Sequence, residues 1–155
     1  EGYVGTKAPD SPVTPFPDIY RALASITNTK TGVQDKSKVV LQISFASAGF
    51  EVDANGLLAA TTIYHPSPDT IARRLGQRDT VVTYDTSARN PAATYTTEDG
   101  MKILLWYEDA RSVADKITLA RMMGITGVSV WRLGNVPTYS GLPNYDAWSA
   151  ILAQR

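Results

Sequence analysis

The last third of the chain changes its hydrophobic period twice, and this limits its possible folds more than any other feature. Residues 101–107 and 127–133 are rich in β-branched and aromatic side chains, as strands are. Residues 111–123, between them, carry apolar residues at helical spacing and end at a glycine. The apolar residues of this helical face are Val113, Ile117 and Ala120. A strand, a helix and a strand in this order predict a βαβ unit with a right-handed crossover, and therefore an α/β fold.

Upstream of this unit, one more segment is typical of a parallel sheet. Residues 38–45 form a β-rich run without clean alternation, which favours a strand covered on both faces. Residues 1–17 contain four prolines and are interpreted as a loop. Helix signals predict further helices that begin at Pro17, that run from Ser67 to Gly76, and that cover about residues 144–154.

Between these segments, the sequence indicates an antiparallel insertion. Residues 80–85 and 92–97 are β-rich, and the turn at residues 98–100 leads directly into the run at 101–107. Residues 46–66 show no clear period and are interpreted as irregular. We therefore expect a small antiparallel β-hairpin insertion over about residues 80–100, within a single domain formed by residues 1–155.

The charge balance argues against partners that are held by bulk electrostatics. Fifteen basic and fifteen acidic residues give a formal net charge of 0, so neither nucleic acid nor an anionic membrane surface is an expected partner. No apolar run approaches the roughly 20 residues that span a bilayer. The first residues do not form a signal peptide, so any export signal is expected outside this chain. There is no cysteine, which excludes disulfides, thiolate metal sites and a cysteine nucleophile.

Few residues offer the chemistry of a metal or cofactor site. The single histidine, His65, lies in a predicted loop and is interpreted as a surface residue, because no Gly-x-Ser-x-Gly nucleophile elbow supports it. One histidine without cysteine does not make a zinc site. The sequence contains neither an Asp-x-Asp-x-Asp-Gly calcium loop nor a glycine-rich phosphate loop before a helix. We therefore predict no metal and no cofactor.

Two pairs of neighbouring carboxylates remain as candidates for acid–base chemistry. Glu98 and Asp99 lie in the predicted hairpin turn and are interpreted as solvated turn residues. Glu108 and Asp109 follow a strand, at the end where α/β sheets and barrels carry their sites. Asp109 either contributes to such a site or caps the next helix, and Glu108 either lines the site or faces water.

Trp131 stands at the end of the predicted strand over residues 127–133, where the chain leaves the sheet. A tryptophan at this point either fills the core or presents its indole as a stacking surface for a sugar. The spacing alone leaves both interpretations open.

Three segments share a family pattern. They are Leu-Trp-Tyr-Glu-Asp-Ala-Arg-Ser over residues 105–112, Lys116, and Gly-Val-Ser-Val-Trp-Arg-Leu-Gly over residues 127–134. Together they resemble the end of glycoside hydrolase family 18, in particular its bacterial spore-cortex and cell-wall members. Residues 38–45 are similar to the strand that precedes them in the family. The resemblance implies a partial (β/α)8 barrel, formed by the last three or so strands and helices, with the hairpin as a small insertion.

The sequence departs from the family in the residues that perform catalysis. The family's acid lies in an Asp-x-x-Asp-x-Asp-x-Glu motif and protonates the glycosidic oxygen, while the substrate's own N-acetyl group acts as nucleophile. No such spacing occurs in this chain. Glutamine, serine and alanine at positions 42, 44 and 46 stand where glycine, proline and tyrosine are usual. The resemblance thus implies no catalytic residue here. It implies substrate-binding roles for Trp131, at the floor of the cleaved-sugar subsite, and for Tyr107 and Glu108 at its rim.

Two functions remain open at this point. The first is the C-terminal segment of a glycosidase that acts on N-acetylglucosamine polymers, either chitin or peptidoglycan, and whether the chain is itself an enzyme stays undecided. The second is a non-catalytic carbohydrate-binding or structural cell-wall module with the same fold. The expected partners are the polysaccharide and either the missing N-terminal half of the barrel or a second copy of this chain. The expected location is extracellular, in the bacterial cell wall or spore envelope.

Overall fold

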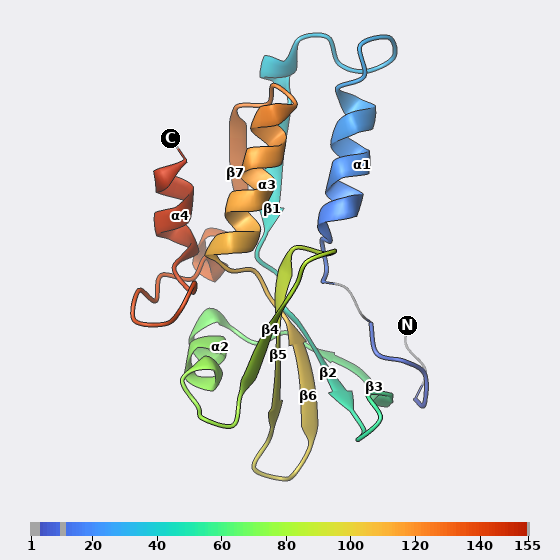
Figure 1. Cartoon of the computed structure of the whole chain (residues 1–155), viewed down its shortest axis with the longest axis vertical. Coiled ribbons are helices and arrows are strands. Elements are labelled where there is room, and N and C mark those ends of the chain that lie inside the picture. Colours follow the sequence, from blue (N-terminus) through green and yellow to red (C-terminus); the bar gives the residue numbers. More distant parts are fainter. Residues whose placement is uncertain (1–3, 10–11, 155) are drawn as a thin grey trace.

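The computed structural model describes residues 4–9 and 12–154, which form two regions stacked along the long axis of the molecule (Figure 1). The upper region comprises α1 (Phe16–Ile26), β1 (Val40–Ser44), α3 (Ala110–Met122), β7 (Gly127–Trp131) and α4 (Ala147–Ala153). The lower region comprises β2 (Ala48–Val52), β3 (Leu58–Tyr64), α2 (Pro68–Leu75), β4 (Val81–Asp85), β5 (Asn90–Thr96) and β6 (Lys102–Trp106). Short 3₁₀ helices cover Lys36–Lys38 and Leu133–Asn135. Within the described residues, no helix is long and apolar enough to cross a membrane.

The strands β1 and β7 pair in parallel, in a register that runs from Val40 opposite Gly127 to Ser44 opposite Trp131. The helices α1, α3 and α4 pack against one face of this pair (Figure 1). The buried residues of the shared core include Leu23, Leu41, Ile43, Val113, Ile117, Ile125 and Ala147. Burial of each large aliphatic side chain in such a core contributes roughly 1.5–3 kcal/mol.

The other face of the parallel pair is not covered by the described chain. Leu41 and Ile43 are buried, whereas Gln42 is exposed and Val40 is 55% exposed. The prediction that this strand is covered on both faces is therefore wrong for the described residues. The reason is that Val40 makes the run look continuously apolar, although burial along the strand alternates as in any strand with one open face.

The lower region is a five-stranded sheet in the order β3-β2-β6-β5-β4, with all neighbours antiparallel. One face packs against α2, through a cluster that includes Ile71, Tyr95, Ile103 and Leu105. The other face packs against the N-terminal segment, where Ala8 joins Phe50, Val52, Leu58 and Trp106. The Trp106 Nε1–H donates a hydrogen bond to the Pro9 carbonyl (3.0 Å). The middle of each face of this sheet is therefore covered within the chain, whereas Ile63, Tyr64, Val81 and Val82 of the edge strands β3 and β4 are exposed.

Residues 46–66 are not irregular, as the sequence suggested, but form the hairpin of β2 and β3. Its turn is built on Asp53, whose carboxylate accepts hydrogen bonds from the backbone N–H groups of Asn55 (2.8 Å) and Leu57 (2.9 Å). Gly56 supplies a positive φ of 78°. The hairpin escaped detection because β3 is rich in alanine and threonine and shows little contrast between its two faces.

The predicted βαβ unit is wrong in its first strand. β6 pairs antiparallel with β2 and β5, and the parallel partner of β7 is β1. The described chain therefore holds two parallel strands rather than three, and the antiparallel part extends well beyond residues 80–100. Sequence order alone suggested the wrong partner, because the whole five-stranded sheet is inserted between β1 and α3. The α/β class is confirmed, as are the hairpins β4–β5 and β5–β6.

The helix ends follow their predicted signals closely. Ser67 caps α2 by accepting from the Thr70 N–H, and Asp146 caps α4 by accepting from the Ser149 N–H. α4 begins at Ala147, three residues later than expected. After α3, Gly124 adopts a φ of 81°, which a residue with a side chain rarely adopts. The proline-rich loop predicted over residues 1–17 carries no regular helix or strand over residues 4–9 and 12–15. Its last two residues, Phe16 and Pro17, belong to α1 instead, and residues 1–3 and 10–11 lie outside the described residues.

Candidate functional site

Trp131 is exposed at the carboxyl end of the parallel strands. It is the last residue of β7, lies opposite Ser44, and is 62% exposed. Its carbonyl accepts a hydrogen bond from the backbone N–H of Phe45 (2.7 Å), which fixes the main chain at this point. The peptide bond from Trp131 to Arg132 is cis. The core interpretation of Trp131 is therefore wrong, and its indole is free to contact a ligand.

The uncovered face of the parallel pair, hereafter the open face, leads up to this indole. Alternate residues share one face of a strand, and the register sets Val40, Gln42 and Ser44 of β1 beside Gly127, Ser129 and Trp131 of β7. Apart from Val40 and the indole, these residues are small or polar. An exposed aromatic side chain at the end of a polar strip suits a hydroxylated ligand better than a purely apolar one.

Glu108 lies in a buried polar cluster instead of facing water. One carboxylate oxygen accepts from the Ser112 hydroxyl (2.6 Å), and the other accepts from the Lys116 ammonium and the Thr14 hydroxyl (3.3 Å). The side chains of Glu108 and Lys116 are only 3% and 1% exposed. The carboxylate thus ties α3 to the segment that precedes α1, and the interpretation that it faces water is wrong.

Asp109 is the N-cap of α3, which confirms the capping interpretation. Its side chain accepts from the backbone N–H groups of Arg111 and Ser112, and the Ser112 hydroxyl accepts in return from the Asp109 N–H (2.9 Å). The Arg111 guanidinium pairs with the same carboxylate (2.8 Å) and lies 4.3 Å from the ring centroid of Tyr84. Ser112 is the partner of Asp109 in this capping box, because the helix begins one residue after Asp109.

Tyr107 is a buried residue at the junction of the two regions. Its ring meets the edge of Tyr145 at 5.7 Å between centroids, with an angle of 83° between the ring planes. Burial, and next the nearby Asp109 carboxylate, raise the pKa of the Tyr107 phenol. Of the three residues expected to bind substrate, Trp131 is exposed, whereas Tyr107 and Glu108 are largely buried. Both buried residues line a small pocket with Phe45 and Tyr145, and Tyr107 also lines a second pocket beside Tyr84.

His65 is a surface residue, as the sequence predicted, and its Nδ1 lies 2.6 Å from the carbonyl oxygen of Ser47. The Ser47 hydroxyl donates to the Pro66 carbonyl (2.9 Å). The two contacts of Ser47 therefore connect the segment after β3 to the segment after β1. Within residues 4–9 and 12–154, no three histidine, aspartate or glutamate side chains gather in a way that would hold a metal ion.

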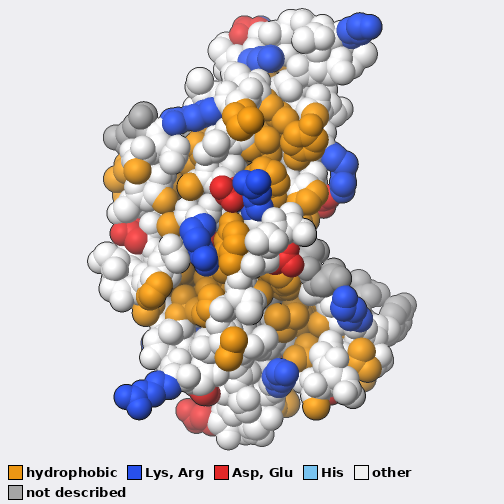
Figure 2. Space-filling view, in the orientation of Figure 1, with side chains coloured by type: hydrophobic (Ala, Val, Ile, Leu, Met, Phe, Trp, Pro, Cys, Tyr) orange, Lys and Arg blue, Asp and Glu red, His pale blue; other side chains and the backbone are white. Residues whose placement is uncertain are grey.

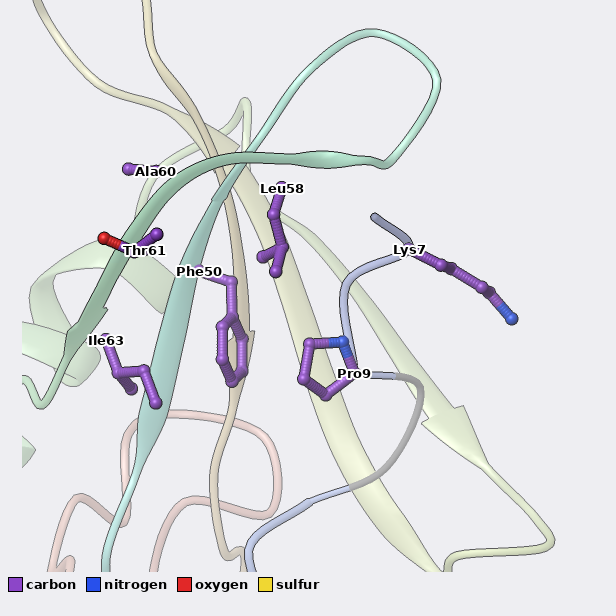
Figure 3. Close-up of a pocket in the computed structure, with 7 residues that line it drawn as sticks. All are labelled: Lys7, Pro9, Phe50, Leu58, Ala60, Thr61 and Ile63. Atoms are coloured by element: carbon purple, nitrogen blue, oxygen red, sulfur yellow. The ribbon is translucent and has the colours of Figure 1, made fainter. Parts of the chain in front are cut away.

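Besides a cavity of about 250 Å³ between β4 and Tyr107, two cavities lie on the antiparallel sheet that sequence reasoning did not identify. The first, of about 250 Å³, is mostly apolar and lies between the N-terminal segment and the strands β2 and β3 (Figure 3). Figure 3 shows Pro9 facing Phe50 and Leu58 across it. The second, of about 380 Å³, lies on the face of the sheet that carries α2 and has a polar and aromatic lining.

Figure 2 shows that apolar atoms are also exposed on the helical side of the molecule, between scattered charges.

A comparison with curated proteins finds relatives of limited length. The chain is 40% identical over 53 residues to a cortical fragment-lytic enzyme of Bacillus anthracis, a match that covers 34% of this chain and 12% of that enzyme. A cortical fragment-lytic enzyme of Bacillus subtilis is 34% identical over 58 residues, which cover 37% of this chain and 14% of that enzyme. No family model matches the chain.

Solved structures share the fold over nearly the whole chain. The spore cortex-lytic enzyme SleL of Bacillus megaterium superposes with a TM-score of 0.71 and 19% identity, over 97% of this chain and 32% of that protein. A glycoside hydrolase family 18 N-acetylglucosaminidase of Paenibacillus barengoltzii gives 0.63 and 16%, over 100% of this chain and 44% of that protein. The chain thus spans less than half the length of these structures. The resemblance to the C-terminal part of family 18 and spore cortex-lytic enzymes is confirmed.

Proposed function

We propose that this chain is the C-terminal part of a family-18-like (β/α)8 catalytic barrel that acts on N-acetylglucosamine-containing polysaccharide of the bacterial cell wall or spore cortex. Two kinds of observation support the proposal. The relatives carry the names of cortical fragment-lytic and chitinase-like enzymes. The parallel pair β1–β7, with helices on one face and an open second face, has the arrangement of two adjacent barrel strands.

The exposed indole of Trp131 carries the functional part of this proposal. In barrel enzymes the site lies at the carboxyl ends of the strands, and Trp131 is the last residue of β7. An indole can cover the apolar face of a pyranose ring, and the loss of a central aromatic contact commonly costs about 2 kcal/mol or more of binding. We assign Trp131 as the main sugar contact. Tyr107 and Glu108 are assigned a supporting role beneath the site, because both are buried.

This chain by itself is proposed not to hydrolyse its substrate. It lacks the Asp-x-x-Asp-x-Asp-x-Glu spacing, and the one carboxylate beside the strand ends that the resemblance placed at the site, Glu108, is bound by Lys116 and Ser112. General-acid catalysis typically contributes 10²–10⁴-fold to the rate. The acid is therefore proposed to come from elsewhere in the protein.

A second candidate function is a non-catalytic carbohydrate-binding or structural wall module. It is favoured by Gln42, Ser44 and Ala46, which replace the glycine, proline and tyrosine usual in the family. Two of these residues, Gln42 and Ser44, lie on the open face that leads to Trp131. Both functions require the same sugar contact, and they differ only in whether an acid is supplied.

The open face also defines the expected partner. The outer edges of β1 and β7 have no neighbouring strand within the described residues, and an unpaired edge next to an uncovered face favours association. The face is proposed to pair with the N-terminal strands of the barrel, or with a second copy of this chain when those strands are absent. The proposed location is the extracellular side of the cell, in the wall or the spore envelope.

The experiment that tests the proposal compares Trp131→Ala with the unaltered chain. Because the indole is exposed, the melting temperature should change by less than about 3 °C, while binding of an N-acetylglucosamine tetramer should weaken at least tenfold. Trp148, which packs against the core, is the matched control: Trp148→Ala should lower the melting temperature clearly. Unchanged binding by Trp131→Ala would overturn the assignment, and a collapse of its stability would assign Trp131 to the core.

A further inference from the structure

The cavity of about 380 Å³ on the antiparallel sheet brings together side chains that no part of the proposed function uses. Its walls come from β2, β3, β5, β6 and α2. The residues that matter for a ligand are Glu51, Tyr64, His65, Arg74, Tyr95 and Asp99. The volume lies within the range of about 300–1,000 Å³ that small-molecule sites in proteins have.

Tyr64 forms an aromatic wall of this cavity. It is the last residue of β3, pairs with Gly49 of β2, and is 45% exposed. A Cβ atom at Gly49 would lie 3.2 Å from the Cδ1 atom of the ring, a tight contact, so the ring lies close against the Gly49 backbone. Nearly half of the Tyr64 side chain nevertheless stays accessible.

Tyr95 and Arg74 form a second wall. The Arg74 guanidinium lies 4.9 Å from the ring centroid of Tyr95, and Tyr95 is buried beneath it. Burial, and next the neighbouring Tyr64 hydroxyl, raise the pKa of Tyr95. The Tyr95 phenol therefore keeps its proton at physiological pH. A phenolic hydroxyl, such as those of Tyr64 and Tyr95, can both donate and accept a hydrogen bond.

The charges around the cavity select the class of ligand. Arg74 offers hydrogen-bond donors, whereas Glu51 and Asp99 offer acceptors. An anionic ligand would therefore be repelled by two carboxylates. A cationic ligand would be repelled by the Arg74 guanidinium, which already covers the face of the Tyr95 ring. A neutral ring that carries many hydroxyl groups uses the aromatic wall, the donors and the acceptors together.

We propose that this cavity is a second glycan-binding site, which takes one or two sugar units of the polymer whose main contact is Trp131. The identity of the polymer rests on the proposed function, but the site itself does not depend on Trp131. A short path joins the two places: Phe45 is hydrogen-bonded to Trp131, and Ser47, two residues later, is in contact with His65 at the cavity wall. One strand of polysaccharide that touches both sites gains affinity by linkage.

The test is a titration of the 155-residue chain with an N-acetylglucosamine tetramer, carried out in the Trp131→Ala background so that only the second site reports. Binding should persist there, and Tyr64→Ala should weaken it at least tenfold. Tyr20→Ala is the matched control, since Tyr20 is an equally exposed tyrosine on α1, at 51%. Arg74→Gln should weaken binding several-fold, whereas its neighbour Arg73→Gln should leave it unchanged, because Arg73 does not line the cavity.

Each outcome decides between the two sites. The second site is overturned if the Trp131→Ala chain does not bind the tetramer, or if adding Tyr64→Ala does not change the affinity. In either case the assignment of Trp131 as a sugar contact still stands. Loss of binding on Tyr64→Ala alone, with Trp131→Ala indistinguishable from the unaltered chain, supports the second site and overturns the assignment of Trp131. Binding of an acidic peptidoglycan stem peptide in place of the glycan also overturns the proposal. Should Tyr64→Ala unfold, Arg74→Gln against Arg73→Gln makes the same decision.

Discussion

In the antiparallel region, α2 covers the middle of one face of the sheet and the N-terminal segment covers the middle of the other, and only the edge strands stay largely exposed. In the parallel region, the helices cover one face of β1 and β7, and the opposite face stays open. The sequence supplies apolar residues for both faces of the first sheet. For the parallel pair it supplies them mainly for one face, and the other face carries Val40, Trp131 and residues that are polar or small. This difference supports the proposal that further strands or a ligand cover the second face of the parallel pair.

The largest effect is expected from breaking the buried ion pair of Lys116 and Glu108, which lies where the two regions meet. Lys116→Met leaves the Glu108 carboxylate buried without its counter-charge, which should lower the free energy of unfolding by about 3–5 kcal/mol in urea titrations. Lys102→Met, on the exposed side of β6, should cost less than about 0.5 kcal/mol. A cost below about 1 kcal/mol for Lys116→Met would show that the pair does not hold the junction.

The next test compares one buried residue of the closed sheet with one residue of the open face. Leu105 is buried under α2, and Leu105→Ala should cost about 2–5 kcal/mol by chemical denaturation. Val40→Ala removes a similarly apolar side chain from the open face, and in the unassociated chain it should cost less than about 0.5 kcal/mol. Similar costs for the two substitutions would mean that the open face is covered after all.

A smaller effect is expected in the pH dependence of the free energy of unfolding, through the buried phenol of Tyr107. The folded-state pKa of Tyr107 is raised by burial above its unfolded value of about 10, so the neutral phenol is the form favoured by folding. Its contribution to stability is complete below pH 10 and is lost as the pH rises above it, by up to about 1.4 kcal/mol per pH unit. Tyr107→Phe should therefore flatten the alkaline loss of stability, measured by urea unfolding between pH 9 and pH 11. Tyr20→Phe, at an exposed position, should leave the slope as it is; identical slopes for both variants would contradict the burial of Tyr107.

The features that sequence reasoning found were those set by local chemistry. Asp109 and Ser67 cap helices because their side chains reach N–H groups two or three residues away, and such contacts can be inferred from neighbours in the sequence. The position of Trp131 at the end of a strand was inferred in the same way. Partners distant in sequence were not found. β1 and β7 are separated by the whole antiparallel sheet, and no local signal states that they pair.

The same contrast between local and distant contacts explains which site residues the sequence placed wrongly or missed. Glu108 was expected at a rim or in water because its sequence neighbours suggest only that it ends a strand. Its true surroundings come from Lys116, eight residues later, and Thr14, 94 residues earlier. Tyr64 was passed over because the face it shares with Gly49 and Tyr95 exists only once β2, β3 and β5 lie in one sheet.

The most direct test of the central claim, that the open face carries the glycan contact, is the response of the three indole N–H signals in an NMR titration with an N-acetylglucosamine tetramer. The Trp106 indole is bound to the Pro9 carbonyl and Trp148 packs against the core, so only Trp131 is free to meet the ligand. We expect the Trp131 signal alone to shift, in a saturable manner that gives the dissociation constant. A Trp131 signal that stays in place while the ligand binds elsewhere, or equal shifts of all three signals, would contradict the account.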